Sequence, residues 1–265
     1  MQIFRRLAFK IEQIIAFFHH THTPVALTLD ALKLKRRSFI AVAEGHLCLR
    51  LEPSCGESFT FFENLIRRDY LTSGIVLRPG DTVVDIGANI GSFAVLAGAL
   101  VGPAGRVIAF EPVPKTYERL KSNLALNGLL NVKCAPVALD ASDGKMSISS
   151  SRKSALSTAH LAYNQPTDSS DIEVDTITLA RACRENSVDR IHLLKVDCEG
   201  SEYGIFETMS ADLASRIDQI AMEVHVMDGK STDALAESIE AHGFIITRRG
   251  CNWFGSRAKR DIVED

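Results

Sequence analysis

The feature that most constrains the fold is the alternation, from residue 80 onward, of short hydrophobic runs with segments of helical periodicity. Strands are predicted over 82–86, 106–112, 132–139, 190–197 and 219–226, with a small edge strand at 145–150. Helices are predicted over 91–100, 114–128, 176–186, 202–209 and 231–243, and a C-terminal hairpin turns near Gly250. Before residue 80, a hairpin is predicted over 38–51 and a helix over 61–71. Strands that alternate with helices build a parallel sheet with helices on both faces. The sequence therefore predicts an α/β fold with a doubly wound, mostly parallel sheet and an antiparallel C-terminal hairpin.

Acidic residues stand at or near the ends of the predicted strands. They are Asp85, Glu111, Asp197 and Glu223. In open parallel sheets, ligands bind outside the carboxyl ends of the strands. We therefore expect these four side chains to surround a ligand site.

The first of these strands ends in a glycine turn, VVDIGANIG, residues 83–91. A dinucleotide site of the form G-x-G-x-x-G needs a second glycine at the position where Asn89 stands. Asp85, directly before the turn, would repel a pyrophosphate. A ligand that carries positive charge in place of phosphates suits this aspartate better. S-adenosylmethionine is such a ligand, because it has a sulfonium, an ammonium and no phosphate.

The second strand ends in Glu111, which lies 24 residues after Gly87. A carboxylate at this place can accept both hydroxyls of a ribose. The alternative is that Glu111 complements the N-terminus of the helix that begins near Pro114. Together with the glycine turn, Glu111 favours a ligand that contains adenosine.

Four segments in this order, VVDIGANIGSF, RVIAFEPVPKTYERLKSNLALNG, LLKVDCEGSE and IAMEVH, resemble class I S-adenosylmethionine-dependent methyltransferases, and more narrowly the FkbM family. The resemblance covers roughly residues 60 to 255. It implies a seven-stranded sheet, a methyltransferase domain over 59–265 and an accessory segment over 1–58. It also implies O-methylation of a hydroxyl on a sugar, glycolipid or polyketide-like metabolite. An NAD-dependent oxidoreductase and a non-catalytic S-adenosylmethionine-binding protein are the two alternatives.

The same resemblance assigns residues to the cofactor. The methionyl part is expected near the glycine turn and the ribose near the end of the second strand, with the adenine past the third strand. The residues implied are Asp85, Gly87, Ala88, Asn89, Gly91, Glu111, Pro112, Ala138, Leu139 and Asp197.

The acceptor side is expected after the fourth long strand, where the sequence reads KVDCEG over 195–200. It holds neither a proline nor an aromatic ring to stack a base, which disfavours methylation of a nucleobase. Cys198 is expected to be a small thiol in a tight turn rather than a nucleophile. The net charge of −3 gives no basic field for nucleic acid. The expected partner is a small-molecule or glycan-like acceptor.

A hydroxyl acceptor must lose its proton as the methyl group is transferred. His225 and Asp197 are the candidate general bases, and Glu223 is expected to support His225 because the two lie two residues apart on one strand. Lys195 either orients Asp197 and holds the substrate or forms an ion pair with Asp85 or Glu111. From the ordinary pKa of histidine, activity is expected to rise near pH 6.5.

A divalent cation is the alternative way to activate the hydroxyl. Asp197, Glu199 and Glu223 offer the oxygen ligands that Mg²⁺ prefers. The competing interpretation is that Glu199 and Glu202 only begin a helix and complement its positive end.

The N-terminal segment is amphipathic over 3–18. We expect this helix to bury its apolar face on the chain or in a homodimer, with docking on a membrane surface as the alternative. No segment is long and apolar enough to span a membrane, and six cysteines without a CxxC pair favour a cytoplasmic location. The acceptor pocket is expected from 19–60 and 150–170, with a flexible loop or lid over 150–158.

Overall fold

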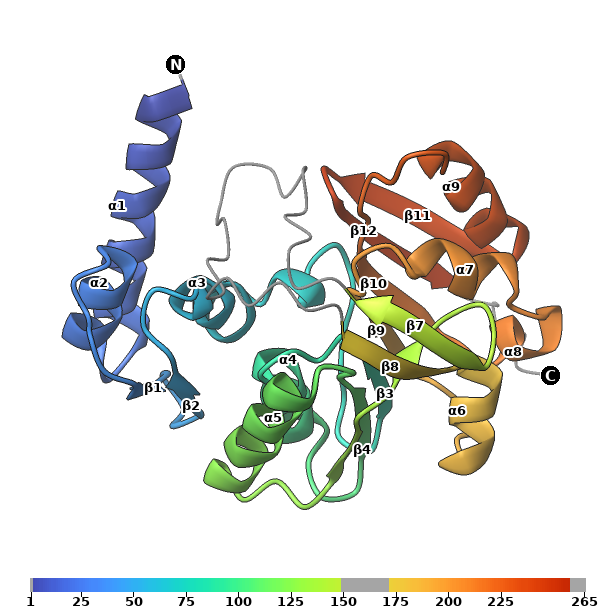
Figure 1. Ribbon diagram of the computed structural model, residues 1–265, viewed down its shortest axis with the longest axis horizontal. Helices are drawn as coiled ribbons and strands as arrows, with labels where there is room; N and C mark the ends of the chain where they lie inside the picture. The colour runs from blue at the N-terminus through green and yellow to red at the C-terminus, as the bar shows by residue number, and fades with distance from the viewer. Residues whose placement is uncertain (1, 149–171, 258–265) are drawn as a thin grey trace, which may run out of the picture.

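The computed structural model describes residues 2–148 and 172–257 (Figure 1). Its centre is a seven-stranded sheet in the order β11-β12-β10-β9-β3-β4-β5. Five strands run parallel, and the last two form an antiparallel hairpin with β12 beside β10. The strands are β3 (Thr82–Ile86), β4 (Arg106–Phe110), β5 (Val132–Ala135), β9 (Leu193–Val196), β10 (Gln219–Glu223), β11 (Phe244–Arg249) and β12 (Asn252–Arg257). The predicted fold class and hairpin are confirmed.

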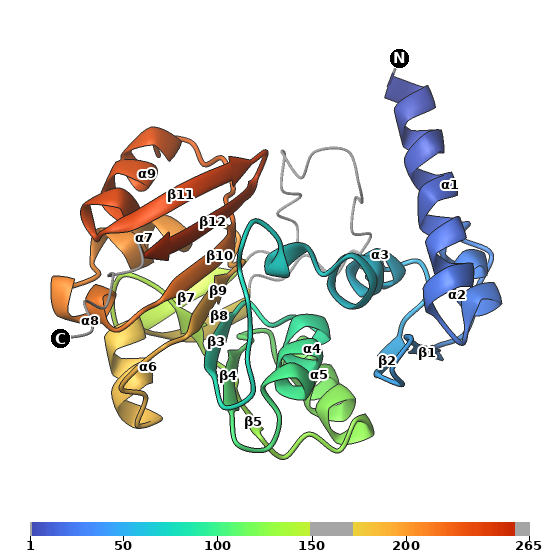
Figure 2. The ribbon, with the colours of Figure 1, turned by 180° about the vertical axis from the view of Figure 1, so that it is seen from behind.

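Helices cover both faces of this sheet (Figure 2). Alternate residues of β3 show the division, since Val84 packs with α6, α7, α8 and α9, whereas Val83 packs with α4. Helix α5 packs with α4 on the second face, in a core that the N-terminal elements share. These helices are α4 (Ser92–Val101), α5 (Pro114–Leu126), α6 (Leu179–Glu185), α7 (Glu202–Glu207), α8 (Ala211–Ser215) and α9 (Thr232–Ala241). The sheet is therefore doubly wound, as the alternation predicted.

A second sheet departs from the prediction. The strand expected over 132–139 is two strands, because β6 (Ala138–Leu139) leaves the main sheet and pairs with β8 (Ile172–Ile177), which in turn pairs with β7 (Gly144–Ile148). The helix expected over 176–186 begins later, because the Thr178 hydroxyl accepts a hydrogen bond from the Arg181 backbone N–H and caps α6. The predicted lid over 150–158 and the acceptor segment 150–170 lie outside the described residues.

The N-terminal segment adds helices and a hairpin. They are α1 (Gln2–His20), α2 (Pro24–Ala31), the β1 (Phe39–Val42) and β2 (Cys48–Leu51) hairpin, α3 (Glu57–Phe61), the π-helical η1 (Phe62–Arg67) and the 3₁₀ turn η2 (Asp69–Leu71). The hairpin predicted over 38–51 is confirmed. The single helix predicted over 61–71 is wrong, because Arg68 takes a left-handed conformation (φ 56°) that breaks it. No helix among the described residues is long and apolar enough to cross a membrane.

This segment shares a hydrophobic core with the sheet domain. Phe17 of α1 and Phe62 of η1 belong to one buried cluster with Leu120 of α5. Polar contacts add to it, since the Asn123 side chain accepts a hydrogen bond from the Arg50 backbone N–H at 2.8 Å. The division of the chain at 58/59 stays a prediction.

The apolar face predicted for the first helix does not pack on this chain. Phe17 is buried, but Phe4, Ile11, Ile15 and Phe18 are exposed. The packed face is the one that holds Phe17 and Gln13, because α1 crosses η1 on that side. Burial of the predicted face within the chain is therefore wrong for the residues described.

Candidate active site

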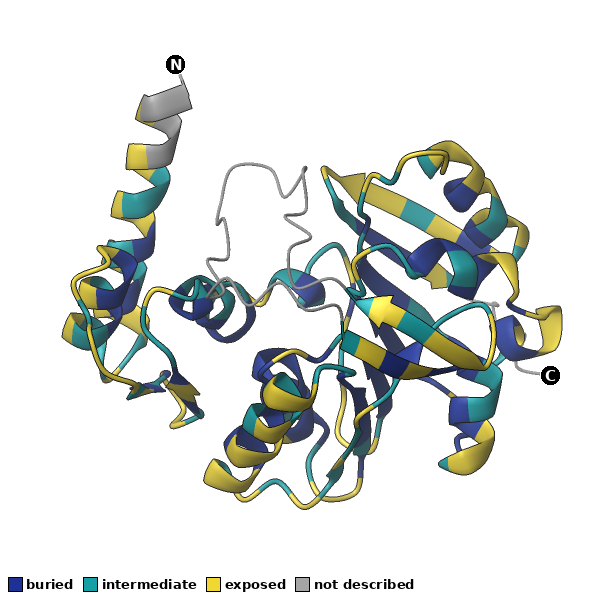
Figure 3. Ribbon diagram, viewed as in Figure 1, coloured by how far each residue is buried: buried dark blue, intermediate teal, exposed yellow. Residues whose placement is uncertain are grey.

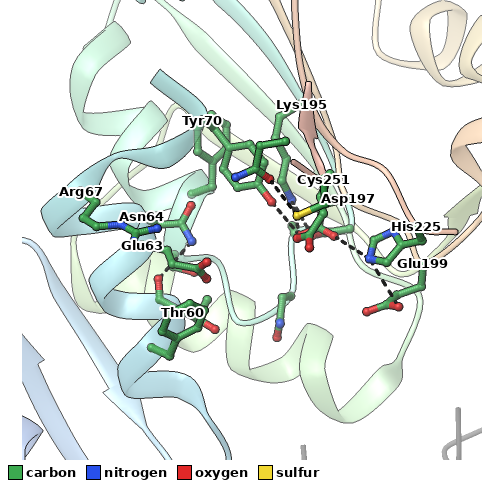
Figure 4. A pocket seen from close by; sticks show the side chains of 18 of the residues that line it. Thr60, Glu63, Asn64, Arg67, Tyr70, Lys195, Asp197, Glu199, His225 and Cys251 are labelled. Atoms are coloured by element: carbon green, nitrogen blue, oxygen red, sulfur yellow. Dashed lines mark hydrogen bonds and ion pairs between the residues drawn. The ribbon is translucent and has the colours of Figure 1, made fainter. Parts of the chain in front are cut away.

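A pocket of about 330 Å³ lies at the carboxyl ends of β3, β9 and β10 (Figure 4). One side is the glycine turn and the other is a wall from the N-terminal segment, and the strand ends and the β11–β12 turn complete it. The lining comprises Phe9, Phe59, Thr60, Glu63, Asn64, Arg67, Tyr70, Gly87, Ala88, Asn89, Ser92, Phe93, Lys195, Asp197, Glu199, Glu223, His225, Cys251 and Asn252. The position and the volume suit a small-molecule site.

Close packing fixes the glycine turn. Gly87 has φ 72°, and a Cβ there would overlap the backbone carbonyl oxygen of Asp197. A Cβ at Gly91 would lie 2.5 Å from Leu120 Cδ1 of α5. Asn89, at φ 51°, occupies a left-handed position that asparagine tolerates. The glycines therefore let the turn approach β9 and α5.

Lys195 and Asp85 form a buried ion pair beneath the turn. Lys195 Nζ lies 3.0 Å from Asp85 Oδ1 and donates to the carbonyl oxygen of Gly87 at 2.8 Å. Burial opposes the charge on Lys195, but Asp85 and Asp197 outweigh it and raise the Lys195 pKa. Burial raises the pKa of Asp85 against the effect of Lys195, and the 3.0 Å separation favours the ionised pair. The predicted ion pair with Asp85 is therefore present, and Lys195 Nζ also lies 3.8 Å from Asp197 Oδ2, which keeps open the predicted role of orienting Asp197. Lys195 lines the pocket, whereas Asp85 does not.

Glu111 holds the other end of the turn. Its Oε2 accepts a hydrogen bond from the Asn89 backbone N–H at 2.9 Å, and its Oε1 accepts one from Val113 at 3.0 Å. Burial raises the pKa of Glu111 to about 7, although these bonds lower it. Ala138 and Leu139 are buried. Neither they nor Glu111 and Pro112 line the pocket, so their contact with adenosine stays a prediction.

His225 lies among carboxylates at the other side of the pocket. Its Nδ1 is 3.3 Å from Glu202 Oε1, while Nε2 is 3.6 Å from Glu199 Oε2 and 3.9 Å from Asp197 Oδ1. Glu202 is fully buried and also accepts the backbone N–H of His225 at 2.8 Å. Glu202 accepts these hydrogen bonds because α7 begins at Glu202 and brings its carboxylate against the chain that follows β10. The support predicted from Glu223 stays a prediction.

These carboxylates change the protonation of the imidazole. Burial lowers the pKa of His225, but the hydrogen bond to Glu202 and the charges of Asp197 and Glu199 outweigh it and raise the pKa to about 9. His225 is therefore an imidazolium at neutral pH in the ligand-free pocket. The pKa of 6.5 that the sequence predicted for His225 is therefore too low, because these carboxylates raise it.

The N-terminal wall carries a second shifted carboxyl. Burial and the charges of Asp69 and Glu223 raise the pKa of Glu63 to about 9, against the lowering by Arg67. Glu63 is therefore a neutral hydrogen-bond donor at pH 7. Beside it, the Tyr70 hydroxyl donates to Asp197 Oδ2 at 2.9 Å.

Asp197, Glu223 and His225 can also hold a cation. One ligand atom from each lies within 4.8 Å of the other two. This trio differs from the predicted set, because His225 takes the place of Glu199, whose side chain is 69% exposed. Cys198 does not offer a ready thiolate, since burial and Glu202 raise its pKa well above the usual range.

Sequence reasoning brought Lys195, Asp197, Glu199, Glu223 and His225 to one pocket, but it missed most of the N-terminal wall. Thr60 and Phe59 fall in the predicted acceptor segment 19–60. Phe9, Glu63, Asn64, Arg67 and Tyr70 do not. The signal that could have found them is the cluster of polar residues in FENLIRRDY, which follows the aromatic run directly.

Comparison with known proteins identifies the family. The model of the FkbM methyltransferase domain matches residues 85–246. The 31-O-demethyl-FK506 methyltransferase FkbM of Streptomyces tacrolimicus is 30% identical over 220 residues, which cover 73% of this chain and 84% of that protein. The methyltransferase sdnD of Sordaria araneosa is 28% identical over 204 residues, 64% of this chain and 76% of that protein. This chain belongs to the FkbM methyltransferase family.

A solved structure is also similar to this chain, at lower sequence identity. The methyltransferase FkbM of Methylobacillus flagellatus is 18% identical, with a TM-score of 0.48, and the alignment covers 76% of this chain and 50% of that chain. Family membership confirms the predicted methyltransferase, and S-adenosylmethionine is the methyl donor that it indicates.

Proposed function

We propose that this protein transfers a methyl group from S-adenosylmethionine to a hydroxyl of a small molecule, of the sugar, glycolipid or polyketide-like class. The observation that carries the proposal is the placement of His225 and Asp197 in the pocket that the glycine turn borders. Family membership favours methyl transfer over the dehydrogenase alternative. The Streptomyces relative is named as a methyltransferase of 31-O-demethyl-FK506, which describes methylation of an oxygen.

The described residues fit the proposed cofactor. The turn over 87–89 lines the pocket, and Asp197, Glu199 and Glu223 make the pocket rich in carboxylates, which complement a sulfonium and an ammonium. Asp85 Oδ2 is buried without a hydrogen-bond partner among the described residues. When bound, S-adenosylmethionine supplies an electrophilic methyl group. Asp197 is the residue of this set that we propose to face both cofactor and acceptor.

His225 is proposed to take the proton of the acceptor hydroxyl in its neutral form. A cationic cofactor in the same pocket opposes the charge on the imidazole, and so lowers its pKa from about 9 toward neutrality. Glu202 holds Nδ1, which leaves Nε2 directed toward Asp197 and Glu199. His225 therefore becomes a better base once the cofactor has bound.

A divalent cation is the second candidate for activating the hydroxyl, and the trio of Asp197, Glu223 and His225 favours it specifically. The two routes differ in a direct test. If His225 acts as the base, EDTA leaves activity unchanged. If the cation acts, EDTA abolishes activity, Mg²⁺ restores it, and Asp197→Asn is as damaging as His225→Ala.

Calorimetry tests the donor. We expect S-adenosylmethionine and S-adenosylhomocysteine to bind, and NAD not to bind. Binding of NAD in place of both would overturn the proposal.

All six cysteines are free thiols, which supports our further proposal of a cytoplasmic location.

A further inference from the structure

Helix α1 presents an apolar face that nothing in the described chain covers. Phe4, Leu7, Ile11, Ile15 and Phe18, which we call the outer stripe, are 50–77% exposed. They recur every three or four residues and so lie on one side of the helix over four turns. Figure 1 shows α1 at the edge of the molecule, far from the sheet, and Figure 3 shows exposed positions recurring along it.

Helix α2 extends this apolar surface. It packs against α1 and exposes Val25 and Leu29, and Leu32, which follows it directly, is exposed as well. These three residues also share one helical face, at intervals of four and three. Exposed apolar faces on two helices that pack together are unusual on a soluble monomer and indicate an interaction site.

The charge around the outer stripe indicates its partner. Residues 1–37 hold seven Lys and Arg against two acidic residues, a net charge of +5, while residues 38–265 hold 23 basic and 31 acidic residues, a net charge of −8. One of the two acids, Asp30, is buried and accepts the Ser54 backbone N–H. Lys33, Arg36 and Arg37 are exposed and form no ion pair with a described residue. The apolar surface is thus bordered by cations that are available to an external anion.

A second copy is a poor occupant for this surface. A two-fold contact would bring two segments of +5 together, and their repulsion opposes it. A helix with one apolar face and nearby cations instead suits the interface of an anionic bilayer.

We propose that the outer stripe of α1 and the basic residues after α2 dock this protein, in the membrane plane, on an anionic lipid surface. Phe9 projects from a different side of α1 and lines the pocket. The docked helix, about 10 Å thick, therefore separates the pocket from the lipid. An acceptor dissolved in the bilayer would reach the pocket over this short distance. That last consequence rests on the proposed function, whereas the docking does not.

Co-sedimentation of the full chain with vesicles tests the docking. We expect binding to phosphatidylcholine vesicles that contain phosphatidylglycerol, weak binding to phosphatidylcholine alone, and loss of binding at high salt. Ile11→Glu/Ile15→Glu should weaken partitioning about tenfold or more. The matched control is Leu130→Glu/Ile245→Glu, at exposed apolar residues elsewhere (99% and 63%), which should bind as the wild type does.

A second variant tests the docking with substitutions that should not disturb folding. Lys33→Glu/Arg36→Glu/Arg37→Glu changes only exposed side chains and should remove the preference for anionic vesicles. Calorimetry with S-adenosylhomocysteine checks that every variant retains the cofactor site, so a failed cofactor site is distinguished from failed docking. Wild-type protein that does not bind anionic vesicles overturns the proposal. A wild-type dimer that Ile11→Glu/Ile15→Glu converts to a monomer, without vesicle binding, overturns it in favour of a second copy.

Discussion

The two sides of the pocket are built in opposite ways. On the side of the glycine turn, one local segment over 87–91 is held from beneath by Lys195 and from the side by Glu111. On the side of the N-terminal wall, α1, α3, η1 and η2 each contribute one or a few residues. The first side is fixed by close backbone packing, whereas the second is fixed by long-range side-chain contacts such as Tyr70 with Asp197. The turn therefore tolerates little change, and we propose that substrate specificity varies at the N-terminal wall.

The largest expected effect tests the rigid side. Gly87→Ala places a Cβ against the carbonyl oxygen of Asp197, in backbone that both segments need. We expect loss of S-adenosylmethionine binding in calorimetry and a fall in the free energy of unfolding of more than about 3 kcal/mol. Gly128→Ala is the control, because Gly128 has a similar φ of 63° and open space around it. It should cost only about 1 kcal/mol. Equal effects of the two substitutions would refute the close-packing account.

The next effect concerns the chemical step. His225→Ala should lower kcat by about 10²–10⁴-fold, the usual contribution of a general base, and leave the affinity for S-adenosylmethionine nearly unchanged. His242→Ala, outside the pocket lining, is the control. Steady-state kinetics on an accepted substrate measures both. Near-full kcat in His225→Ala would remove His225 from the mechanism.

The pH dependence of kcat tests the raised pKa of His225, which the structure shows and the sequence did not predict. The base must be neutral, so kcat should rise with pH through the pKa of His225, which is about 9 in the ligand-free protein and is lowered when the cationic cofactor binds. Glu202→Gln removes the carboxylate that raises this pKa, and the rise should move to lower pH by about one unit or more. A structural role of Glu202 alone would lower kcat without moving the profile, and that result would contradict the account.

Features of the fold that depend on local sequence patterns were predictable, whereas contacts between residues far apart in the sequence were not. The sheet, the glycine turn and the C-terminal hairpin were predicted because each leaves a local pattern of hydrophobicity or glycine. Tyr70 and Asp197 are 127 residues apart and meet only in the fold, and a π-helical turn has no period that a sequence displays. The pKa of His225 was mispredicted because the buried carboxylate that raises it belongs to Glu202, at the start of α7, while His225 itself lies beyond the end of β10.

The smallest expected effect concerns Glu63 in the N-terminal wall. The pKa of Glu63 is raised from 4.5 to about 9, so the folded chain retains a proton that the unfolded chain has lost. The raised pKa of Glu63 therefore makes the free energy of unfolding depend on pH. Its contribution is fully present below about pH 4.5 and is lost as the pH rises toward 9. Glu63→Gln should therefore raise the free energy of unfolding by about 1–2 kcal/mol at pH 8, with a smaller change at pH 5. Urea titrations of Glu63→Gln and of Glu237→Gln, which changes an exposed residue, measure this. A gain that is the same at both pH values would count against a neutral Glu63.

The most direct test of the central claim is the fate of the methyl carbon. The protein is incubated with S-adenosylmethionine that carries a ¹³C-labelled methyl group and with a panel of sugars, glycolipids and polyketide-like alcohols. The ¹³C chemical shift of the product then identifies the atom that received the methyl group. We predict a methyl ether, formed by the wild type and by the His242→Ala control but not by Gly87→Ala. Methyl carbon bound to nitrogen, sulfur or carbon would contradict the proposed hydroxyl chemistry.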